Sequence, residues 1–231
     1  SDLVITISES EKQRLIEHGI KTKIDVVYNG VSKKFKEKKF FDESSLKSAA
    51  EKYSLPSEFI LYVGRLNIRK NISNLLKALP HLKSSLPLVI VGAKDWKMFD
   101  VDELIDKLKI KDRVIFTGSV SDDELVLIYS LAKIFCFPSF AEGFGLPAIE
   151  AMASGVPVVV SNTTSLPEVC GEAGSYTDPN IPEEIARRID ELACNESLYR
   201  QKKELGLKRV EVFSWKRSAE RLINLTKSII K

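Results

Sequence analysis

Residues 133–161 read KIFCFPSFAEGFGLPAIEAMASGVPVVVS, and this stretch decides the expected fold. It opens with the apolar run KIFCF (133–137) and closes with VPVVVS (156–161). Both runs are continuously apolar rather than alternating, which is typical of strands in a parallel sheet that is covered on both faces. Between them, residues 146–154 read as a helix with Pro147 in its first turn, where proline is well tolerated. The stretch therefore predicts a strand–helix–strand unit with parallel strands.

The same alternation of apolar runs and helical segments extends along the chain in both directions. Because each crossover places a helix on a face of the sheet, the repetition predicts a doubly wound, Rossmann-like α/β domain. After residue 181 the pattern is helical, so we expect the domain to end in helices. The other expected strands are 59–63, 87–91 and 113–117, and the other expected helices lie near 43–53, 71–82, 102–109 and 122–131.

Two segments stand apart from this domain. Residues 1–28 read as a strand–helix–strand unit of their own, followed by the polar stretch 29–42. The sequence starts without Met, directly on a strand-like run, so we expect it to belong to a longer chain. Residues 213–231 carry apolar side chains on one helical face, and such a face packs against another surface. The expected division is 1–31, 32–212 and 213–231.

Composition argues against several classes of protein. With 44% hydrophobic residues, the 231-residue chain can bury a large core. The formal net charge is only +3, from 35 basic and 32 acidic side chains, so we expect no nucleic-acid partner. No apolar run approaches transmembrane length, and the N-terminus lacks the layout of a signal peptide. Three widely spaced cysteines favour a reducing, cytoplasmic compartment over a disulfide framework: Cys136, Cys170 and Cys194.

The first candidate binding stretch is YVGRLNIRKNI (62–72). Ligands of doubly wound sheets bind at the carboxyl ends of the strands, and Gly64 ends one such strand. Arg65 and Lys70 follow, before a helix that Asn71 is expected to cap. Two cations beside a helix N-terminus suit a phosphate or diphosphate. Taken alone, this stretch is better read as a solvated basic loop.

The second candidate stretch is FTGSVSDDEL (116–125). Gly118 ends a strand, and Ser121 with Glu124 has the spacing of a capping box. The backbone from Gly118 to Val120 can offer hydrogen-bonding groups to a flat ring. A plain strand-to-helix turn explains the residues equally well.

The third candidate stretch contains two acids, Glu142 and Glu150, eight positions apart. Between them, Gly143 and Gly145 let backbone amides approach a ligand, and the following helix start favours an anion. Eight helical residues span about 12 Å, whereas paired glycosidase carboxylates lie about 5–10 Å apart. The two acids therefore suit the ends of a longer ligand better than a single bond. The alternative, a capped helix with solvated acids, leaves the glycines unexplained.

A fourth stretch, residues 161–179, is rich in turn residues. Glu168 is its candidate ligand-binding residue at the same edge of the sheet, although a structural loop is the safer interpretation.

A metal site is not expected. Asp100 and Asp102 match an Asp-x-Asp pattern, but they directly precede a helix, where capping explains them better. The two histidines, His18 and His81, lie on separate helical segments without an acid or cysteine cluster.

Taken together, these stretches resemble the C-terminal half of glycosyltransferase family 4 enzymes, which have the GT-B fold. The resemblance covers essentially the whole chain, and its motifs occur in order at familiar spacings. They are ITISESEKQRL (5–15), VVYNGV (26–31), VGRL (63–66) with Lys70, FTGSV (116–120), PSFAEGFGLPAIEAMASGVPVVVS (138–161), LPEVCGEAG (166–174), DP (178–179) and FSW (213–215).

The resemblance implies transfer of a sugar, with retention of configuration, from a nucleotide diphosphate donor such as a UDP- or GDP-sugar. It implies catalytic roles for Arg65 and Lys70 at the diphosphate and for Glu142 at the sugar, and it requires neither metal nor cofactor. Glu150 would bind the ribose. The remaining donor-binding positions are Gly64, Gly118, Val120, Gly143, Phe144, Gly145 and Leu146.

The resemblance also implies a division of labour. Residues 1–31 would be the end of an N-terminal GT-B domain and its linker, 32–212 the donor-binding domain, and 213–231 a closing helix that docks on the N-terminal domain. The acceptor, a glycan or a lipid-linked glycan of polysaccharide or glycoconjugate biosynthesis, would bind the N-terminal domain. That domain would also make any peripheral contact with the inner face of the membrane. We expect the chain alone to bind donor weakly and to be inactive.

Two alternatives belong to other classes. One is a non-catalytic subunit that binds a nucleotide sugar and completes a site on a partner chain. The other is an epimerase or a phosphorylase of similar architecture. The Glu142 and Glu150 pair in its glycine-proline setting favours a transferase, and no pyridoxal lysine of a phosphorylase is identified.

Overall fold

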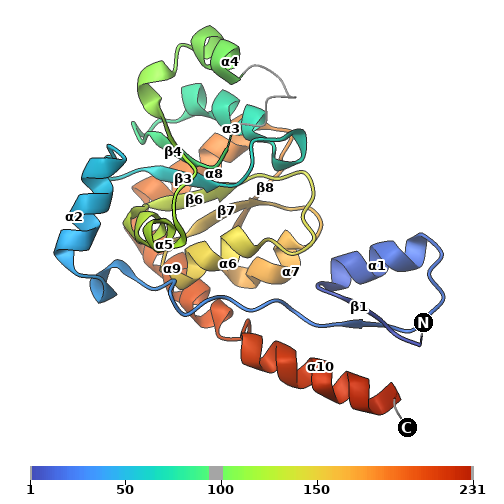
Figure 1. The fold of residues 1–231 in the computed structure, drawn as a ribbon. Helices are drawn as coiled ribbons and strands as arrows, with labels where there is room; N and C mark the ends of the chain where they lie inside the picture. Colours follow the sequence, from blue (N-terminus) through green and yellow to red (C-terminus); the bar gives the residue numbers. More distant parts are fainter. Residues whose placement is uncertain (1, 94–100, 230–231) are drawn as a thin grey trace.

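The computed structural model describes residues 2–93 and 101–229, and its centre is a six-stranded parallel sheet (Figure 1). The strand order is β5-β4-β3-β6-β7-β8, and every neighbouring pair is parallel. This confirms the doubly wound α/β fold. The strands are β3 (Ile60–Val63), β4 (Leu88–Val91), β5 (Val114–Gly118), β6 (Ile134–Phe137), β7 (Val158–Ser161) and β8 (Gly174–Thr177).

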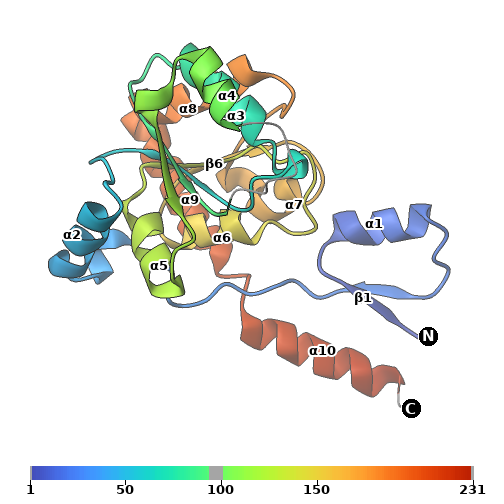
Figure 2. The same cartoon turned by 45° about the horizontal axis from the view of Figure 1, so that its top comes forward.

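Helices cover both faces of this sheet. In the views of Figures 1 and 2, α3, α4 and α8 lie on one face, and α5, α6 and α7 lie on the other. The helix α9 packs against α6, where Gly206 lets the two helices approach at Met152. The helices are α2 (Glu43–Lys52), α3 (Ile72–Ala78), α4 (Val101–Leu108), α5 (Asp122–Leu131), α6 (Leu146–Ala153), α7 (Leu166–Cys170), α8 (Pro182–Cys194) and α9 (Glu196–Val210). Short 3-10 turns are η1 (Lys38–Phe40), η2 (Ile68–Lys70), η3 (Leu79–His81), η4 (Lys111–Arg113) and η5 (Gly171–Ala173).

The core consists mainly of the central strands. All residues of β6 and β7 are buried, as are those of β4 and the first three of β3. Continuous burial on both faces explains why these strands are apolar at every position. The edge strand β8 (GSYT) was not predicted, because its glycine, serine and threonine give it no apolar run.

The N-terminal residues form a separate unit beside the main sheet (Figures 1 and 2). Its two-stranded parallel sheet pairs β1 (Val4–Thr6) with β2 (Ile24–Val26), and α1 (Glu9–Glu17) connects them. The last helix, α10 (Trp215–Ile229), packs along this unit, since the Arg221 guanidinium Nε donates to the Val26 carbonyl at 2.6 Å. The side chains of Leu222 and Ile223 on α10 stay 43% and 52% exposed. The division into 1–31, 32–212 and 213–231 stays a prediction.

Within residues 2–93 and 101–229, no helix has both the length and the apolar character that crossing a bilayer requires.

Candidate functional site

The candidate site lies at the carboxyl edge of the sheet, between β3 and β6. The chain runs outward from β3 through β4 to β5 on one side, and from β6 through β7 to β8 on the other. The loops after β3 and β6 therefore diverge at a topological switch point, which is where doubly wound sheets bind ligands. Lys70 follows β3 and Glu142 follows β6, so the fold brings these two predicted residues to that point.

At this point Glu142, Lys70 and Arg69 form a compact charge cluster. The Glu142 Oε1 lies 2.7 Å from the Lys70 ammonium, and its Oε2 lies 3.3 Å from the Arg69 guanidinium. The Glu142 side chain is 7% exposed and that of Lys70 13%. Burial removes water from these groups, so their charges are compensated by one another rather than by solvent. Lys70 Nζ also lies 4.6 Å from the centre of the Phe137 ring.

Arg69 was missed by the sequence reasoning, which paired Arg65 with Lys70. The available signal was that Arg69 directly precedes Lys70 in the same short loop. Its Nη1 also donates to the Ala141 carbonyl at 2.7 Å, so it contacts two consecutive residues of the loop after β6. Arg65 itself is exposed, and its carbonyl accepts a hydrogen bond from Tyr62. The role of Arg65 stays a prediction.

Asn71 occupies the N-cap position of α3, as expected, but the expected cap by its side chain is absent. Asn71 adopts the left-handed conformation (φ 56°) and its side chain does not cap α3. Its Nδ2 instead donates to the carbonyls of Pro138 at 2.9 Å and Pro179 at 2.7 Å. This amide is 1% exposed and ties the turn after β3 to the loop after β6. Asn67 provides the side-chain cap in this region, because its Oδ1 accepts from the Lys70 backbone amide at 3.0 Å.

Hydroxyl groups after β7 hold the loop that carries Glu142. Thr164 Oγ1 accepts from the Glu142 amide at 3.0 Å, and Ser165 Oγ donates to the Glu142 carbonyl at 2.9 Å. Thr163 Oγ1 donates to the Phe140 carbonyl at 3.1 Å in the same way. Both backbone groups of Glu142 are thus bonded to side chains after the next strand, which holds its backbone in place, while Lys70 and Arg69 contact its carboxylate.

The start of α6 provides the predicted glycine-rich turn. Gly145 has φ 97°, and a Cβ there would lie 2.6 Å from Leu166 Cδ2, so only glycine fits without strain. Pro147 stands in the first turn of α6, as expected. Phe144 is buried against Tyr28 and Phe213, so only its backbone can serve a ligand. Gly143 is half-buried and Leu146 is 37% exposed at this turn.

Glu150 lies one turn further along α6. Its Oε2 accepts a hydrogen bond from the Tyr129 hydroxyl at 2.9 Å. Burial raises the pKa of Glu150, the Tyr129 hydrogen bond lowers it, and the nearby Asp122 charge raises it further. Asp122 opens α5, so the residue predicted for the ribose faces the helix that follows the loop from Gly118 to Val120.

The predicted glycines Gly64 and Gly118 stand where β3 and β5 give way to the loops that follow them. Gly118 is exposed with φ 70°, and Val120 is half-buried. Gly64 directly follows β3, and its carbonyl oxygen would lie 2.2 Å from a Cβ on Gly92. The capping box of Ser121 and Glu124 is present as predicted. Whether Gly64, Gly118 and Val120 bind a ligand stays a prediction.

The other sequence candidates lie away from this cluster. Glu168 points to the first turn of α1 rather than to the charge cluster. His18 ends α1, and His81 lies 3.5 Å from Glu183, far along the chain from Glu142. Asp100 lies outside the described residues. In the described part of the chain, no three His, Cys, Asp or Glu side chains are grouped as a metal site would need.

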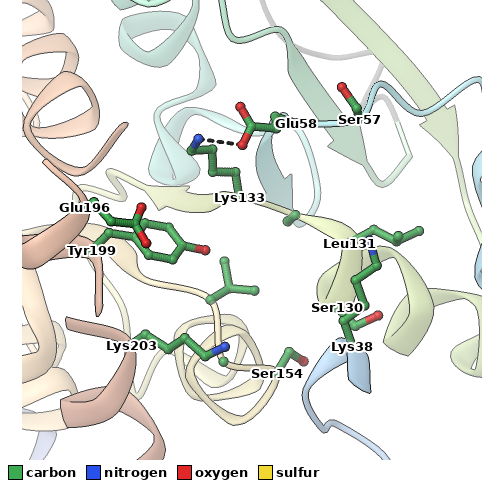
Figure 3. Close-up of a pocket in the computed structure, with 13 residues that line it drawn as sticks. Lys38, Ser57, Glu58, Ser130, Leu131, Lys133, Ser154, Glu196, Tyr199 and Lys203 are labelled. Atoms are coloured by element: carbon green, nitrogen blue, oxygen red, sulfur yellow. Dashed lines mark hydrogen bonds and ion pairs between the residues drawn. The ribbon is translucent and has the colours of Figure 1, made fainter. Parts of the chain in front are cut away.

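A cavity of about 280 Å³ opens at the opposite edge of the sheet, where β3, β6 and β7 begin (Figure 3). Lys133 and Lys203 line it, but Lys133 pairs with Glu58 at 2.6 Å and Lys203 with Glu37 at 3.0 Å. The Lys133 and Lys203 ammonium groups are thus paired with carboxylates, and the cavity lies at the end of the strands away from the switch point. The charge cluster at Glu142 is therefore the better candidate.

Known proteins are similar to this chain in sequence and in fold. The family described as Glycosyl transferases group 1 matches residues 45–209. The serotype-specific mannosyltransferase WbdA of Escherichia coli is 36% identical over 229 residues, covering 95% of this chain and 28% of that protein. The O-antigen chain mannosyltransferase B of Escherichia coli is 37% identical over 182 residues, covering 77% and 48%. The chain thus spans less than half the length of these two relatives. The sucrose-phosphate synthase structure from Thermosynechococcus elongatus has a TM-score of 0.86 and 28% identity, covering 100% of this chain and 59% of that one.

Proposed function

Because the chain belongs to the glycosyl transferases group 1 family, we propose that it forms the donor-binding half of a retaining, family 4 glycosyltransferase. The observation that carries this proposal is the cluster of Lys70, Arg69 and Glu142 at the switch point between β3 and β6. It places two cations and one buried carboxylate beside the glycine-rich start of α6. A nucleotide diphosphate sugar has matching parts, namely an anion and a neutral ring with hydroxyl groups.

In this proposal the cations serve the leaving group. Lys70 is held in place by Glu142, and its remaining N–H donors can bind the diphosphate together with Arg65 and Arg69. Glu142 accepts a hydrogen bond from a sugar hydroxyl, and Glu150 binds the ribose. Breaking the sugar–phosphate bond leaves charge on the diphosphate, and preorganised cations stabilise that charge. No metal or cofactor is required.

The identity of the relatives favours a mannosyl donor. Both named Escherichia coli relatives are mannosyltransferases, and one is named for the O-antigen chain. We therefore propose transfer of mannose from a GDP- or UDP-linked donor to a glycan or lipid-linked acceptor in polysaccharide biosynthesis. Because the chain spans less than half the length of these two relatives, we propose that the acceptor site and the rest of the catalytic cleft lie outside these 231 residues and that the 231 residues alone do not transfer sugar.

Calorimetric titration with GDP, UDP and ADP tests the donor site. Lys70→Ala should weaken binding of the preferred nucleotide at least about tenfold, because it removes a charge-assisted contact to phosphate. Lys133→Ala is the matched control, since Lys133 forms a similar short pair with Glu58 at the opposite edge of the sheet. Equal affinity of the two variants would refute the phosphate assignment. Robust sugar transfer by the isolated chain would refute the proposed need for residues outside it.

A further inference from the structure

The first turn of α1 lies directly on the loop that carries Glu142. Ser8 caps α1, and its Oγ accepts from the Glu11 amide at 3.1 Å while donating to the Gly143 carbonyl at 2.7 Å. A Cβ on Gly143 would lie 3.6 Å from Ile7 Cδ1, so the two segments are in close contact. The N-terminal unit therefore touches the candidate site at the residue next to Glu142.

Glu168 closes this contact from the other side. Its Oε1 accepts from the Glu9 amide at 2.8 Å, and its Oε2 accepts from the Ser10 amide at 3.1 Å. Glu9 and Ser10 are the first two residues of α1, whose amides have no partner inside the helix. A carboxylate at this position also interacts favourably with the helix dipole. Figures 1 and 2 both show α1 beside α7, the helix that carries Glu168.

The Glu168 carboxylate is itself held in position. The Arg209 guanidinium donates to the Glu168 carbonyl at 2.6 Å and to the Val169 carbonyl at 2.9 Å, which fixes α7. The pKa of Tyr28 is raised to about 12, first by burial and then by the neighbouring Glu168 carboxylate. Three residues before Glu168, Ser165 donates to the Glu142 carbonyl. The helix α7 and the residue directly before it thus contact both α1 and the loop of Glu142.

We propose that Glu168 is a positioning residue of the donor site, whose carboxylate holds the first turn of α1 against the loop at Glu142 and Gly143. The loop is then held by two hydrogen bonds, from Ser8 to the Gly143 carbonyl and from Ser165 to the Glu142 carbonyl. Donor binding and the seating of the N-terminal unit become coupled, because both depend on the same loop geometry. The part that concerns the donor rests on the proposed function.

Hydrogen exchange tests the contact without any ligand. In Glu168→Ala, the amides of Glu9 and Ser10 should exchange at least about tenfold faster, while amides of β3, β6 and β7 should keep their rates. Glu168→Gln retains one acceptor oxygen and should give an intermediate rate. Glu172→Ala, which removes an exposed acid just after α7, is the matched control and should leave the amides of α1 unchanged. Unchanged exchange at Glu9 and Ser10 in Glu168→Ala would overturn the proposal.

Nucleotide titration tests the coupling. Glu168→Ala and Ser8→Ala should each weaken binding of the preferred nucleotide diphosphate by about fivefold to tenfold, within the usual range of coupling between sites. Faster exchange in α1 with wild-type nucleotide affinity would overturn the positioning role and leave only a helix cap. If the wild type binds none of GDP, UDP and ADP, the proposed function fails, and the donor part of this proposal fails with it.

Discussion

The side chain of Asn71 offers a stability test that can be worked out from the structure. Asn71→Ala removes two hydrogen bonds, to the carbonyls of Pro138 and Pro179, each worth about 1 kcal/mol net. It also places alanine at φ 56°, where a left-handed conformation costs about 1 kcal/mol or more. The Asn71 Oδ1 is buried and has no partner among the described residues, which destabilises the wild type. Removing this oxygen therefore offsets part of the lost free energy of unfolding. The expected net loss of unfolding free energy is about 2–3 kcal/mol.

Two matched variants separate these contributions. Asn71→Gly removes the same hydrogen bonds but tolerates the left-handed backbone, so it should lose about 1 kcal/mol less than Asn71→Ala. Asn74→Ala removes a partly buried bond to the Pro179 carbonyl at 2.9 Å and a long, exposed bond from Lys77 at 3.4 Å, and should lose less than about 1 kcal/mol. Urea unfolding with a shared m-value measures all three, and the Asn71→Ala loss corresponds to a Tm decrease of roughly 4–12 °C. A loss under about 1 kcal/mol for Asn71→Ala would refute the account of this tie between the two loops.

Two further variants test the start and the first turns of α6. Gly145→Ala should destabilise the fold by about 2 kcal/mol, measured by urea unfolding, since it forces a Cβ against Leu166 at φ 97°; wild-type stability would contradict the need for glycine. The pKa of Glu150 is raised in the fold, so its ionisation opposes folding, and stability should fall as pH rises from the ordinary glutamate pKa of about 4.3 through the raised folded value. Glu150→Gln should flatten this part of the stability–pH profile, whereas an unchanged profile would show that Glu150 does not cause it.

The pattern of apolar residues within each strand determined which strands could be predicted from the sequence. The strands β6 and β7 were found at 134–137 and 158–161 because burial on both faces makes every position apolar. The strand β8 was missed because an edge strand with a neighbour on one side tolerates glycine and serine. Its pairing with β7 depends on how the chain packs in three dimensions, and its sequence GSYT shows no strand-like pattern of apolar residues.

The features of the candidate site that could be predicted are those set by residues close together in the sequence. The glycine-rich turn at 143–145 and the capping box at Ser121 follow from short-range rules, and both are present. The partner of Glu142 could not be assigned in the same way, because Lys70 and Arg69 meet it only through the pairing of β3 with β6. Asn71 shows the same limit, since its amide bonds carbonyls 67 and 108 positions away rather than its own helix.

The contact between α10 and the N-terminal unit has a consequence for synthesis. Arg221 bonds the Val26 carbonyl across 195 positions of sequence, so β2 is made long before its partner exists. At about 5–20 residues per second, translation takes roughly 10–40 s to supply that arginine. During this interval the unit that seats on the loop of Glu142 lacks its supporting helix. Nascent chains that stop before α10 should therefore lose protease resistance first at residues 4–26, which include β1, α1 and β2.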